Sequence, residues 1–225
     1  MDNRCGGAHV PAMNDKPWLG SGSALLVIDV QNDFCPGGAL AVPDGDAVLP
    51  GVNRLIAGAD LVVLTQDWHP RRHQSFASAH KGRAPFETVE VAYGPQTLWP
   101  DHCVQGTSGA AFHEDLLTDR AALVVRKGMR PAVDSYSAFF ENDRTTTTGL
   151  DGWLRARGVS RVVCCGLAFD YCVAYSALDA RRLGFDVAVV EDASAAIDLG
   201  GSKATQAEAM AKAGIKLTTA TALGA

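Results

Sequence analysis

Four side chains capable of acid–base or nucleophilic chemistry follow four apolar segments of this sequence. In chain order they are Asp29, Asp67, Lys127 and Cys172. A thiolate is a strong nucleophile, and a carboxylate can take the thiol proton and return it to a leaving group. An ammonium beside them would favour the charged forms of both. Together these residue types predict a nucleophilic cysteine with Asp29 as its base.

Each of these residues also has an ordinary structural explanation. Cys172 could be a packed thiol near the start of a helix, Asp29 could stabilise a turn, and Lys127 could be a solvated lysine. Cys164 and Cys165 lie inside an apolar run, so a packed role is favoured for both. The chemical interpretation depends on all four strand ends meeting at one edge of a sheet.

A metal site is a second candidate. In "QDWHP", Asp67 and His69 are two residues apart, so in an extended segment both side chains point the same way. Oxygen and imidazole ligands together suit zinc, iron or manganese. A third ligand could come from the long loop that follows, whose candidates are His73, Ser75, His80 and His102.

The elements that must position these residues alternate along the chain. Short apolar runs rich in β-branched residues predict buried strands at 24–30, 61–67, 122–127, 161–166, 186–192 and 215–220. Helical spacing predicts helices within 46–60, 150–158, 171–184 and 203–214. This order predicts a single-domain α/β fold: a doubly wound, mostly parallel, Rossmann-like sheet with helices on both faces. The irregular segment 68–107 is long enough to be functional.

Composition excludes several functions. The net charge of −5 and the lack of a basic stripe argue against nucleic acid, and apolar stretches of about six residues are too short for a membrane span. The six cysteines show neither zinc nor disulfide spacing, so we expect free thiols and a cytoplasmic protein. Residues 1–22, rich in Gly, Pro and small polar residues, are predicted to be a flexible extension of a domain at 23–225.

Six motifs carry a family resemblance over residues 23–220. They are "LLVIDVQNDFCPGGALAV", "TQDWHP", "SFASAH", "LWPDHCVQGTSGA", "KGMRPAVDSYSAFF" and "GLAFDYCV". In order and spacing they resemble the isochorismatase-like cysteine hydrolases. The Asp-Trp-His and Trp-Pro-Asp-His elements resemble the metal-containing amidases within them, the nicotinamidases (pyrazinamidases). The resemblance implies hydrolysis of nicotinamide to nicotinate and ammonia in NAD salvage, and of pyrazinamide, through a cysteine thioester.

The resemblance also assigns roles to residues. It implies a catalytic triad of Asp29, Lys127 and Cys172. It implies a divalent metal, with zinc favoured over iron or manganese, that positions the pyridine nitrogen, and no organic cofactor. The implied metal ligands are Asp67, His69 and His102, with Ser75 as a further ligand, directly or through water, and His73 as its alternative.

Further implied features surround the nucleophile. The backbone N–H groups of Ala168 and Cys172 are implied to form the oxyanion hole, next to a cis Leu167–Ala168 peptide. The implied substrate walls are Phe34, Trp99 and Tyr136. Phe169 departs from the family, which often has Thr there, and could either reshape the pocket or pack outside it.

Two alternatives stay open. One is a metal-free member of the same superfamily, an isochorismatase or a carbamoyl-amide hydrolase. The other is a non-catalytic binding scaffold, against which the retained charged cluster argues. The partner expected is the small substrate, and self-association is left open.

Overall fold

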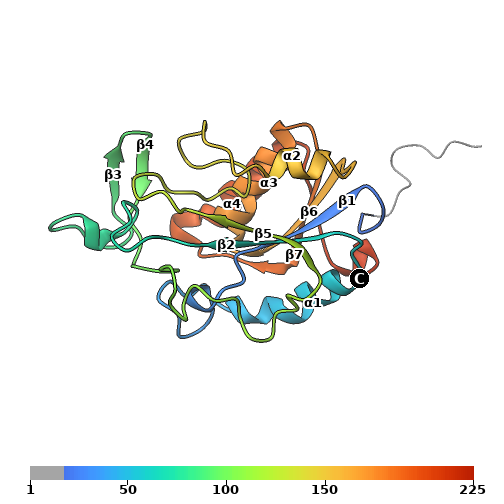
Figure 1. Cartoon of the computed structure of the whole chain (residues 1–225), viewed down its shortest axis with the longest axis horizontal. Helices are drawn as coiled ribbons and strands as arrows, with labels where there is room; N and C mark the ends of the chain where they lie inside the picture. The colour runs from blue at the N-terminus through green and yellow to red at the C-terminus, as the bar shows by residue number, and fades with distance from the viewer. Residues whose placement is uncertain (1–17) are drawn as a thin grey trace, which may run out of the picture.

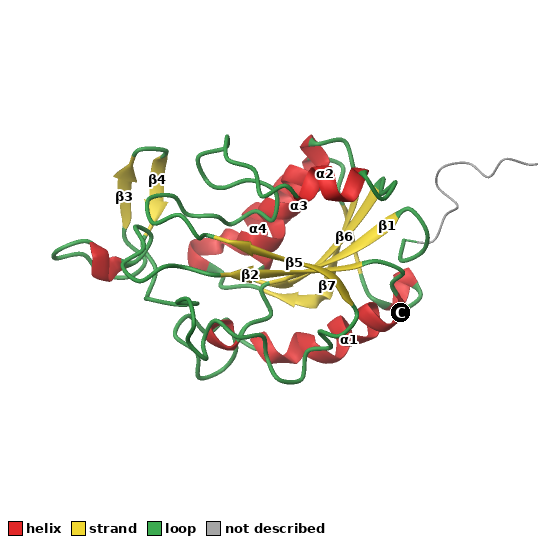
Figure 2. Cartoon of the chain, viewed as in Figure 1, coloured by secondary structure: helices red, strands yellow, loops and turns green. Residues whose placement is uncertain are grey.

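A six-stranded parallel sheet forms the centre of the computed structural model, which describes residues 18–225 (Figures 1 and 2). Its strand order is β5-β2-β1-β6-β7-β8, and each neighbouring pair is parallel. The strands are β1 (Ser23–Ile28), β2 (Val62–Asp67), β5 (Ala121–Lys127), β6 (Arg161–Leu167), β7 (Asp186–Ala195) and β8 (Lys216–Thr218). All six lie where the apolar runs predict strands, and the expected doubly wound α/β fold is confirmed.

The central strands are covered on both faces, as their unbroken apolar runs require. In β1 every residue is buried. Leu25 and Val27 join the core on one face of the sheet, whereas Leu26 and Ile28 join the core on the other. Alternate side chains of a strand point to opposite faces, so a single apolar run supplies both cores.

Helices cover both faces of the sheet. They are α1 (Leu49–Gly58), α2 (Leu150–Arg155), α3 (Ala174–Arg182) and α4 (Ser202–Lys212). The apolar side of α1 packs into one core, and α2, α3 and α4 contribute to the other. In Figure 1, α1 accordingly lies on the opposite side of the strands from the other three helices. Short 3₁₀ turns occupy Asn32–Phe34, Gly45–Val48, Ala77–Ala79, Leu199–Gly201 and Thr221–Leu223.

The direction of winding reverses between β1 and β6. From β1 the chain adds β2 and β5 on one side, and later β6, β7 and β8 on the other. In open α/β sheets, ligands bind beyond the carboxyl ends of the strands at such a reversal. Asp29 follows β1 and Cys172 follows β6, so both residues flank this point.

The segment 68–107 is more regular than the sequence predicts. It contains an antiparallel hairpin of β3 (Thr88–Val91) and β4 (Gly94–Thr97). Both strands have only four residues, and β3 alternates between exposed and half-buried positions. Neither strand therefore produces the apolar run by which the sheet strands are recognised.

The predicted N-terminal extension lies mostly outside the described residues, which begin at Trp18. The part that is described contacts the domain. Leu19 is buried, and its carbonyl accepts a hydrogen bond of 3.0 Å from the N–H of Asp60. Within residues 18–225, no helix combines the length and apolar character that crossing a bilayer demands.

Candidate active site and metal centre

The structure brings the four strand-end groups together at the carboxyl edge of the sheet. Lys127, at the end of β5, lies at their centre: its Nζ is 2.8 Å from Oδ2 of Asp29 and donates a hydrogen bond of 3.4 Å to Sγ of Cys172. The same ammonium donates to Oδ1 of Asp67 and to the carbonyl of Ser135. Alternation along β5 sends the neighbouring Arg126 outward to solvent.

Asp29 has one oxygen satisfied and one available. Its Oδ1 accepts a hydrogen bond of 2.5 Å from the hydroxyl of Thr65, on β2. Its buried Oδ2 forms an ion pair of 2.8 Å with the Lys127 ammonium. Oδ2 therefore retains lone-pair capacity on the side of Cys172, whose sulfur lies within 4.8 Å of a carboxylate oxygen of Asp29.

Cys172 lies on a π-helical turn, Phe169–Val173, between β6 and α3. The sequence predicts a helix from residue 171, whereas the α-helix begins at Ala174. Single π turns are rare and occur frequently at functional sites. The Leu167–Ala168 peptide before the turn is cis, as the family resemblance implies.

The protonation state of the nucleophile depends on its burial and on its charged neighbours. Burial raises the pKa of the Cys172 thiol well above its usual range, and the two nearby aspartates act in the same direction. Lys127 opposes this effect without overcoming it. Burial and the carboxylates thus favour the thiol form of Cys172, so the nucleophile needs a base to accept its proton.

The carboxylates supply the missing base. Burial raises the pKa of Asp29 to about 6, although Lys127 partly offsets this. Burial also works against the ionised form of Asp67, but Lys127 and the neighbouring His69 hold the pKa of Asp67 well below its usual range. Asp67 thus stays charged, whereas Asp29 is tuned to accept and release a proton near neutrality.

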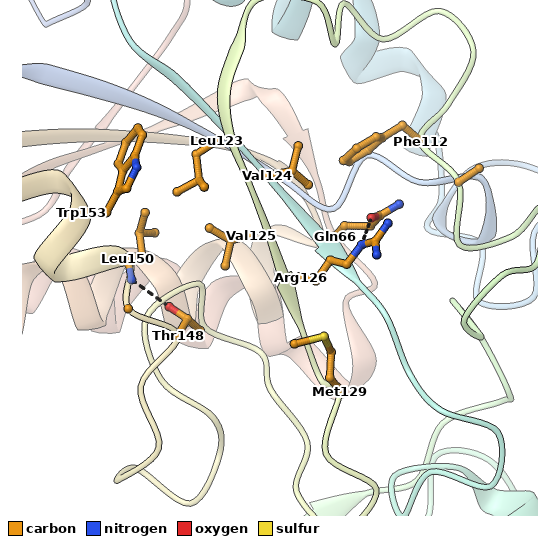
Figure 3. Close-up of a pocket in the computed structure, with 12 residues that line it drawn as sticks. Gln66, Phe112, Leu123, Val124, Val125, Arg126, Met129, Thr148, Leu150 and Trp153 are labelled. Carbon is orange, nitrogen blue, oxygen red and sulfur yellow. Dashed lines mark hydrogen bonds between the residues drawn. The ribbon is translucent and has the colours of Figure 1, made fainter.

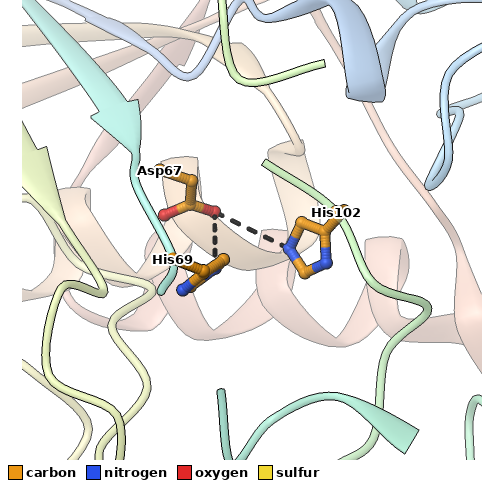
Figure 4. A group of neighbouring side chains, drawn as sticks. All are labelled: Asp67, His69 and His102. Atoms are coloured by element: carbon orange, nitrogen blue, oxygen red, sulfur yellow. Dashed lines mark ion pairs between the residues drawn. The ribbon is translucent and has the colours of Figure 1, made fainter. Parts of the chain in front are cut away.

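A second cluster adjoins the first through Asp67. Figure 4 shows the carboxylate of Asp67 facing the rings of His69 and His102. Its Oδ2 lies 3.7 Å from Nε2 of His69 and 3.9 Å from Nε2 of His102. One ligand atom from each of the three residues lies within 4.8 Å of the others. Among the third ligands that the sequence leaves open, the structure places His102 in this group.

The hydrogen bonds of the two imidazoles involve Nδ1, which leaves Nε2 of each ring facing Asp67. Nδ1 of His69 is 2.9 Å from the carbonyl of Gly128, and Nδ1 of His102 is 2.8 Å from the carbonyl of Pro100. A carbonyl only accepts, so each Nδ1 carries a proton, and in the neutral ring Nε2 presents a lone pair beside Asp67. Although burial opposes its charged form, Asp67 raises the pKa of His69, so a cation bound there would displace the second proton of that ring. Burial lowers the pKa of His102 to about 4, which keeps that ring neutral. Two lone pairs and a carboxylate converging in a buried site form a donor set for a divalent cation.

Ser75 and His73 lie next to this group but are engaged with each other. Oγ of Ser75 is 2.8 Å from Nδ1 of His73, whose Nε2 lies 2.9 Å from the carbonyl of Arg130. Nε2 must donate to that carbonyl, so Nδ1 accepts from the serine hydroxyl. Both ring nitrogens of His73 thus have partners, and its ligand atoms group with those of His69 and Asp134 instead of with Asp67. His80 instead bonds the carbonyl of Gln74 through Nε2.

A small cavity at the strand ends is lined by the nucleophile Cys172 together with Asp67 and His102. Its lining contains the three aromatic walls that the resemblance implies, together with Ala168. It also contains four residues that the sequence does not single out: Leu40, Asp134, Tyr171 and Ile197. Aromatic and apolar side chains with a few polar groups among them are the usual lining of a small-molecule site.

Hydrogen bonds fix the aromatic walls. The indole N–H of Trp99 donates to the hydroxyl of Tyr136 at 3.1 Å, and the side-chain amide of Gln96, on β4, donates to the same oxygen at 3.0 Å. The short hairpin of β3 and β4 therefore supports the pocket wall through the contact of Gln96 with Tyr136. Phe169 is buried in the core on the α2–α4 side and does not line the cavity.

Two further residues hold the candidate metal ligands His69 and Asp67 in place. Gly128 has a φ of +64°, and a Cβ there would lie 2.4 Å from Cε1 of His69, so only glycine fits. The amide of Gln31 bonds the main chain of Asp67 at both ends: its Oε1 accepts from the N–H at 2.8 Å, and its Nε2 donates to the carbonyl at 2.9 Å. The partners are 36 residues apart, so no local pattern announces this pairing.

A larger groove runs along β5, at the edge of the sheet, but lacks this chemistry. Figure 3 shows it lined by apolar side chains such as Val124 and Trp153, with Gln66 and Arg126 as a hydrogen-bonded pair. It contains none of the residues predicted for catalysis or metal binding. The small cavity at the strand ends is therefore the candidate active site.

Comparison with known proteins agrees with this geometry. The profile of the Isochorismatase domain matches residues 23–222. The nicotinamidase of Acinetobacter baylyi is 52% identical over 179 residues, which cover 80% of this chain and 84% of that protein. The nicotinamidase of Escherichia coli is 48% identical over 180 residues, or 78% of this chain and 84% of that protein.

Solved structures give the same result. An Acinetobacter baumanii nicotinamidase/pyrazinamidase superposes with a TM-score of 0.90 at 51% identity, covering 91% of this chain and 99% of that one. The yeast nicotinamidase Pnc1p bound to the inhibitor nicotinaldehyde has a TM-score of 0.81 at 29% identity (87% and 99% covered). A Pyrococcus horikoshii pyrazinamidase in complex with zinc has a TM-score of 0.69 at 40% identity (87% and 98% covered).

Proposed function

This chain belongs to the isochorismatase family, and from that premise we propose that it is a nicotinamidase that hydrolyses nicotinamide to nicotinate and ammonia. One observation carries the proposal. A cysteine that lines the small cavity lies against a buried lysine and its aspartate partner, beside a group of two histidines and an aspartate. Relatives 48% and 52% identical over most of the chain are nicotinamidases. The metal-binding group favours this reaction over that of a metal-free relative.

The first half-reaction forms a thioester. Oδ2 of Asp29 takes the proton of the Cys172 thiol, and Sγ attacks the carboxamide carbon. The ammonium of Lys127 lies against both residues, so it stabilises the negative charge wherever the proton is. The N–H groups of Ala168 and Cys172 are proposed to hold the oxyanion, a contribution of about 3 kcal/mol per donor in comparable sites.

The second half-reaction restores the enzyme. Asp29 gives its proton to the departing nitrogen, and ammonia leaves as the C–N bond breaks. Asp29 then takes a proton from water, whose oxygen attacks the thioester carbon. Nicotinate leaves, and the sulfur regains a proton. With a pKa of about 6, Asp29 can both take a proton from the thiol and give one to the departing nitrogen near neutral pH.

We propose zinc as the metal, held by Asp67, His69 and His102, with Ser75 contributing directly or through water. The donor set is the support, and the zinc-bound pyrazinamidase is a precedent. Bound there, the ion supplies a Lewis acid that can hold the pyridine nitrogen and polarise water. The chain's own contribution is to fix both imidazole tautomers and to present the carboxamide to Cys172 between the walls of Phe34 and Trp99.

Pyrazinamide is proposed as a second substrate because its ring has a nitrogen at the corresponding position. We also propose that the protein works in the cytoplasm. The five cysteines that the structure describes are free thiols, which suits a reducing compartment.

Release of ammonia from nicotinamide by purified protein tests the proposal, with Cys172→Ala as the decisive variant. We expect the variant to release none while still binding nicotinamide, since only the nucleophile is lost. Elemental analysis should find a transition metal, which chelation removes together with substrate affinity. Ammonia release by Cys172→Ala at the wild-type rate would overturn the nucleophile assignment.

A further inference from the structure

Asp170 is a buried carboxylate two residues before the nucleophile, and the mechanism above does not use it. Its side chain is 1% exposed. Oδ1 accepts a hydrogen bond of 3.0 Å from the N–H of Ile197, and Oδ2 accepts one of 2.8 Å from the N–H of Asp198. The hydroxyl of Ser202 also donates to Oδ2, at 2.5 Å. Three donors from another part of the chain thus converge on one buried anion, which offsets the cost of burying it.

These contacts connect two walls of the active-site cavity. Asp170 belongs to the π turn that carries Cys172, whereas Ile197 belongs to the segment between β7 and α4. Both Cys172 and Ile197 line the cavity. The carboxylate therefore connects the turn that presents the sulfur with the part of the cavity wall that contains Ile197.

The turn has few other restraints of this kind. Inside it, the N–H groups of Tyr171 and Val173 share one acceptor, the carbonyl of Ala168, each at 3.1 Å. The hydroxyl of Ser176 donates to the carbonyl of Cys172 at 2.6 Å, which fixes the turn to α3. Asp170 provides the hydrogen bonds toward α4, so its loss would let the turn shift on that side.

We propose that Asp170 is a positioning residue for the proposed amide hydrolysis: it holds the nucleophile turn against Ile197–Asp198, so that Sγ stays beside Lys127 and the oxyanion donors stay aligned. The inference rests on the proposed function. It concerns transition-state geometry more than ground-state binding, because the turn carries Sγ and the proposed oxyanion donors. Trp99 and Tyr136 contact Tyr171 of the turn, but hydrogen bonds from outside the turn also hold them.

Asp170→Asn tests this with little change in shape. The amide nitrogen can donate but not accept, so one of the converging donors must face another donor. A misplacement near 1 Å can cost on the order of 100-fold in rate. We therefore expect kcat to fall about 100-fold with a far smaller change in KM. The affinity for nicotinaldehyde, whose adduct with Cys172 places an oxyanion in the same site, should fall in parallel with kcat/KM.

A merely structural role would give a different result. It would lower thermal stability and the fraction of reactive protein, but not kcat per titrated Cys172 or the aldehyde affinity. Asp198→Asn is the matched control: the same substitution on an exposed side chain keeps the backbone N–H that Asp170 uses, and should leave both quantities at the wild-type value. Wild-type kcat per titrated site in Asp170→Asn would overturn the proposal.

Two further experiments keep the test decisive. If Asp170→Asn does not fold, Ser202→Ala removes one of the three donors, and we expect a smaller fall in kcat per site; no fall would overturn the proposal. Site-resolved alkylation of Cys172 by iodoacetamide needs no substrate. If wild-type protein releases no ammonia, the function fails. Altered alkylation in Asp170→Asn with none in Asp198→Asn would still support positioning, and equal rates in all three proteins would refute it.

Discussion

At the scale of single residues, the site depends on how the ammonium of Lys127 is shared between two carboxylates and a thiol. Residue types identify Lys127, Asp29 and Cys172 from the sequence, because each follows an apolar strand. Their protonation states cannot be read there, since these depend on burial and on a second carboxylate. Burial opposes the charge on Lys127, yet Asp29 and Asp67 raise the pKa of its ammonium well above the ordinary value. The lysine therefore keeps its charge beside two carboxylates and the thiol of Cys172.

The pH dependence of activity should follow the ionisation of the Asp29 carboxyl. Burial raises the pKa of Asp29 from 3.8 to about 6, so the carboxyl is neutral, and unable to act as a base, below that pH. We expect kcat/KM to rise with pH through an apparent pKa near 6. Thr65→Val removes a hydrogen bond that stabilises the ionised form and should move this limb to higher pH. A limb near 4 in wild-type protein, unmoved by the substitution, would contradict this assignment.

Removing the Lys127 charge should destabilise the fold in a pH-dependent way. Lys127→Met leaves two carboxylates without their shared cation, and breaking a buried ion pair costs about 3–5 kcal/mol. Because Asp29 takes up a proton as the pH falls through about 6, the loss should be larger at pH 8 than at pH 5. Urea unfolding at both values measures it. Arg126→Met, on the exposed face of the same strand, is the control, and an equal loss at both pH values would contradict the argument.

At the scale of elements, the sequence predicts the sheet well and the turns poorly. Apolar runs reveal all six sheet strands because these are buried on both faces. The hairpin of β3 and β4 is missed because its strands are short and partly exposed. The π turn at Phe169–Val173 is missed because apolar spacing does not distinguish it from the first turn of a helix. Gln31 and Asp170 are missed because their partners, mostly backbone groups, are distant in the sequence.

Close approach of two strands makes Gly166 a sensitive position. Its φ is +114°, and a Cβ there would lie 2.2 Å from the carbonyl oxygen of Ile28 on β1. Gly166→Ala must therefore separate β1 from β6 at the point where the sheet reverses. We expect a loss of about 3 kcal/mol or more in unfolding free energy, since overpacking adds to the backbone penalty.

Gly184→Ala separates the two contributions to that loss. Gly184 also has a positive φ, +90°, but no atom lies within 4 Å of the added carbon. It should show the backbone penalty alone, about 1–2 kcal/mol. Equal losses at the two glycines in thermal or urea unfolding would show that the contact with Ile28 is unimportant.

At the scale of the whole molecule, four chain segments meet in one site. Asp67 joins its two halves, because one oxygen faces Lys127 and the other faces the histidine pair. The donors of the metal group come from the end of β2 and from a loop more than thirty residues later. Only the folded chain assembles this group, so metal binding and folding should be linked.

Zinc should therefore stabilise the native protein in a concentration-dependent way. A ligand that binds only the folded state at 100 times its Kd adds about 2.7 kcal/mol. We expect the thermal midpoint of wild-type protein to rise with added zinc, and His102→Ala to lose most of this response. His113→Ala removes a histidine outside the group and serves as the control. A full response in His102→Ala would exclude this histidine as a ligand.

All of the chemistry described above lies at the carboxyl ends of the strands, which leaves the opposite rim free for engineering. There the turns before β6 and β7 pass through Gly158 and Gly184, with open space around both. New chain termini, a fused reporter or an attachment point for a solid support could be placed in these turns. An immobilised protein tethered this way would keep the mouth of its cavity facing the bulk solution.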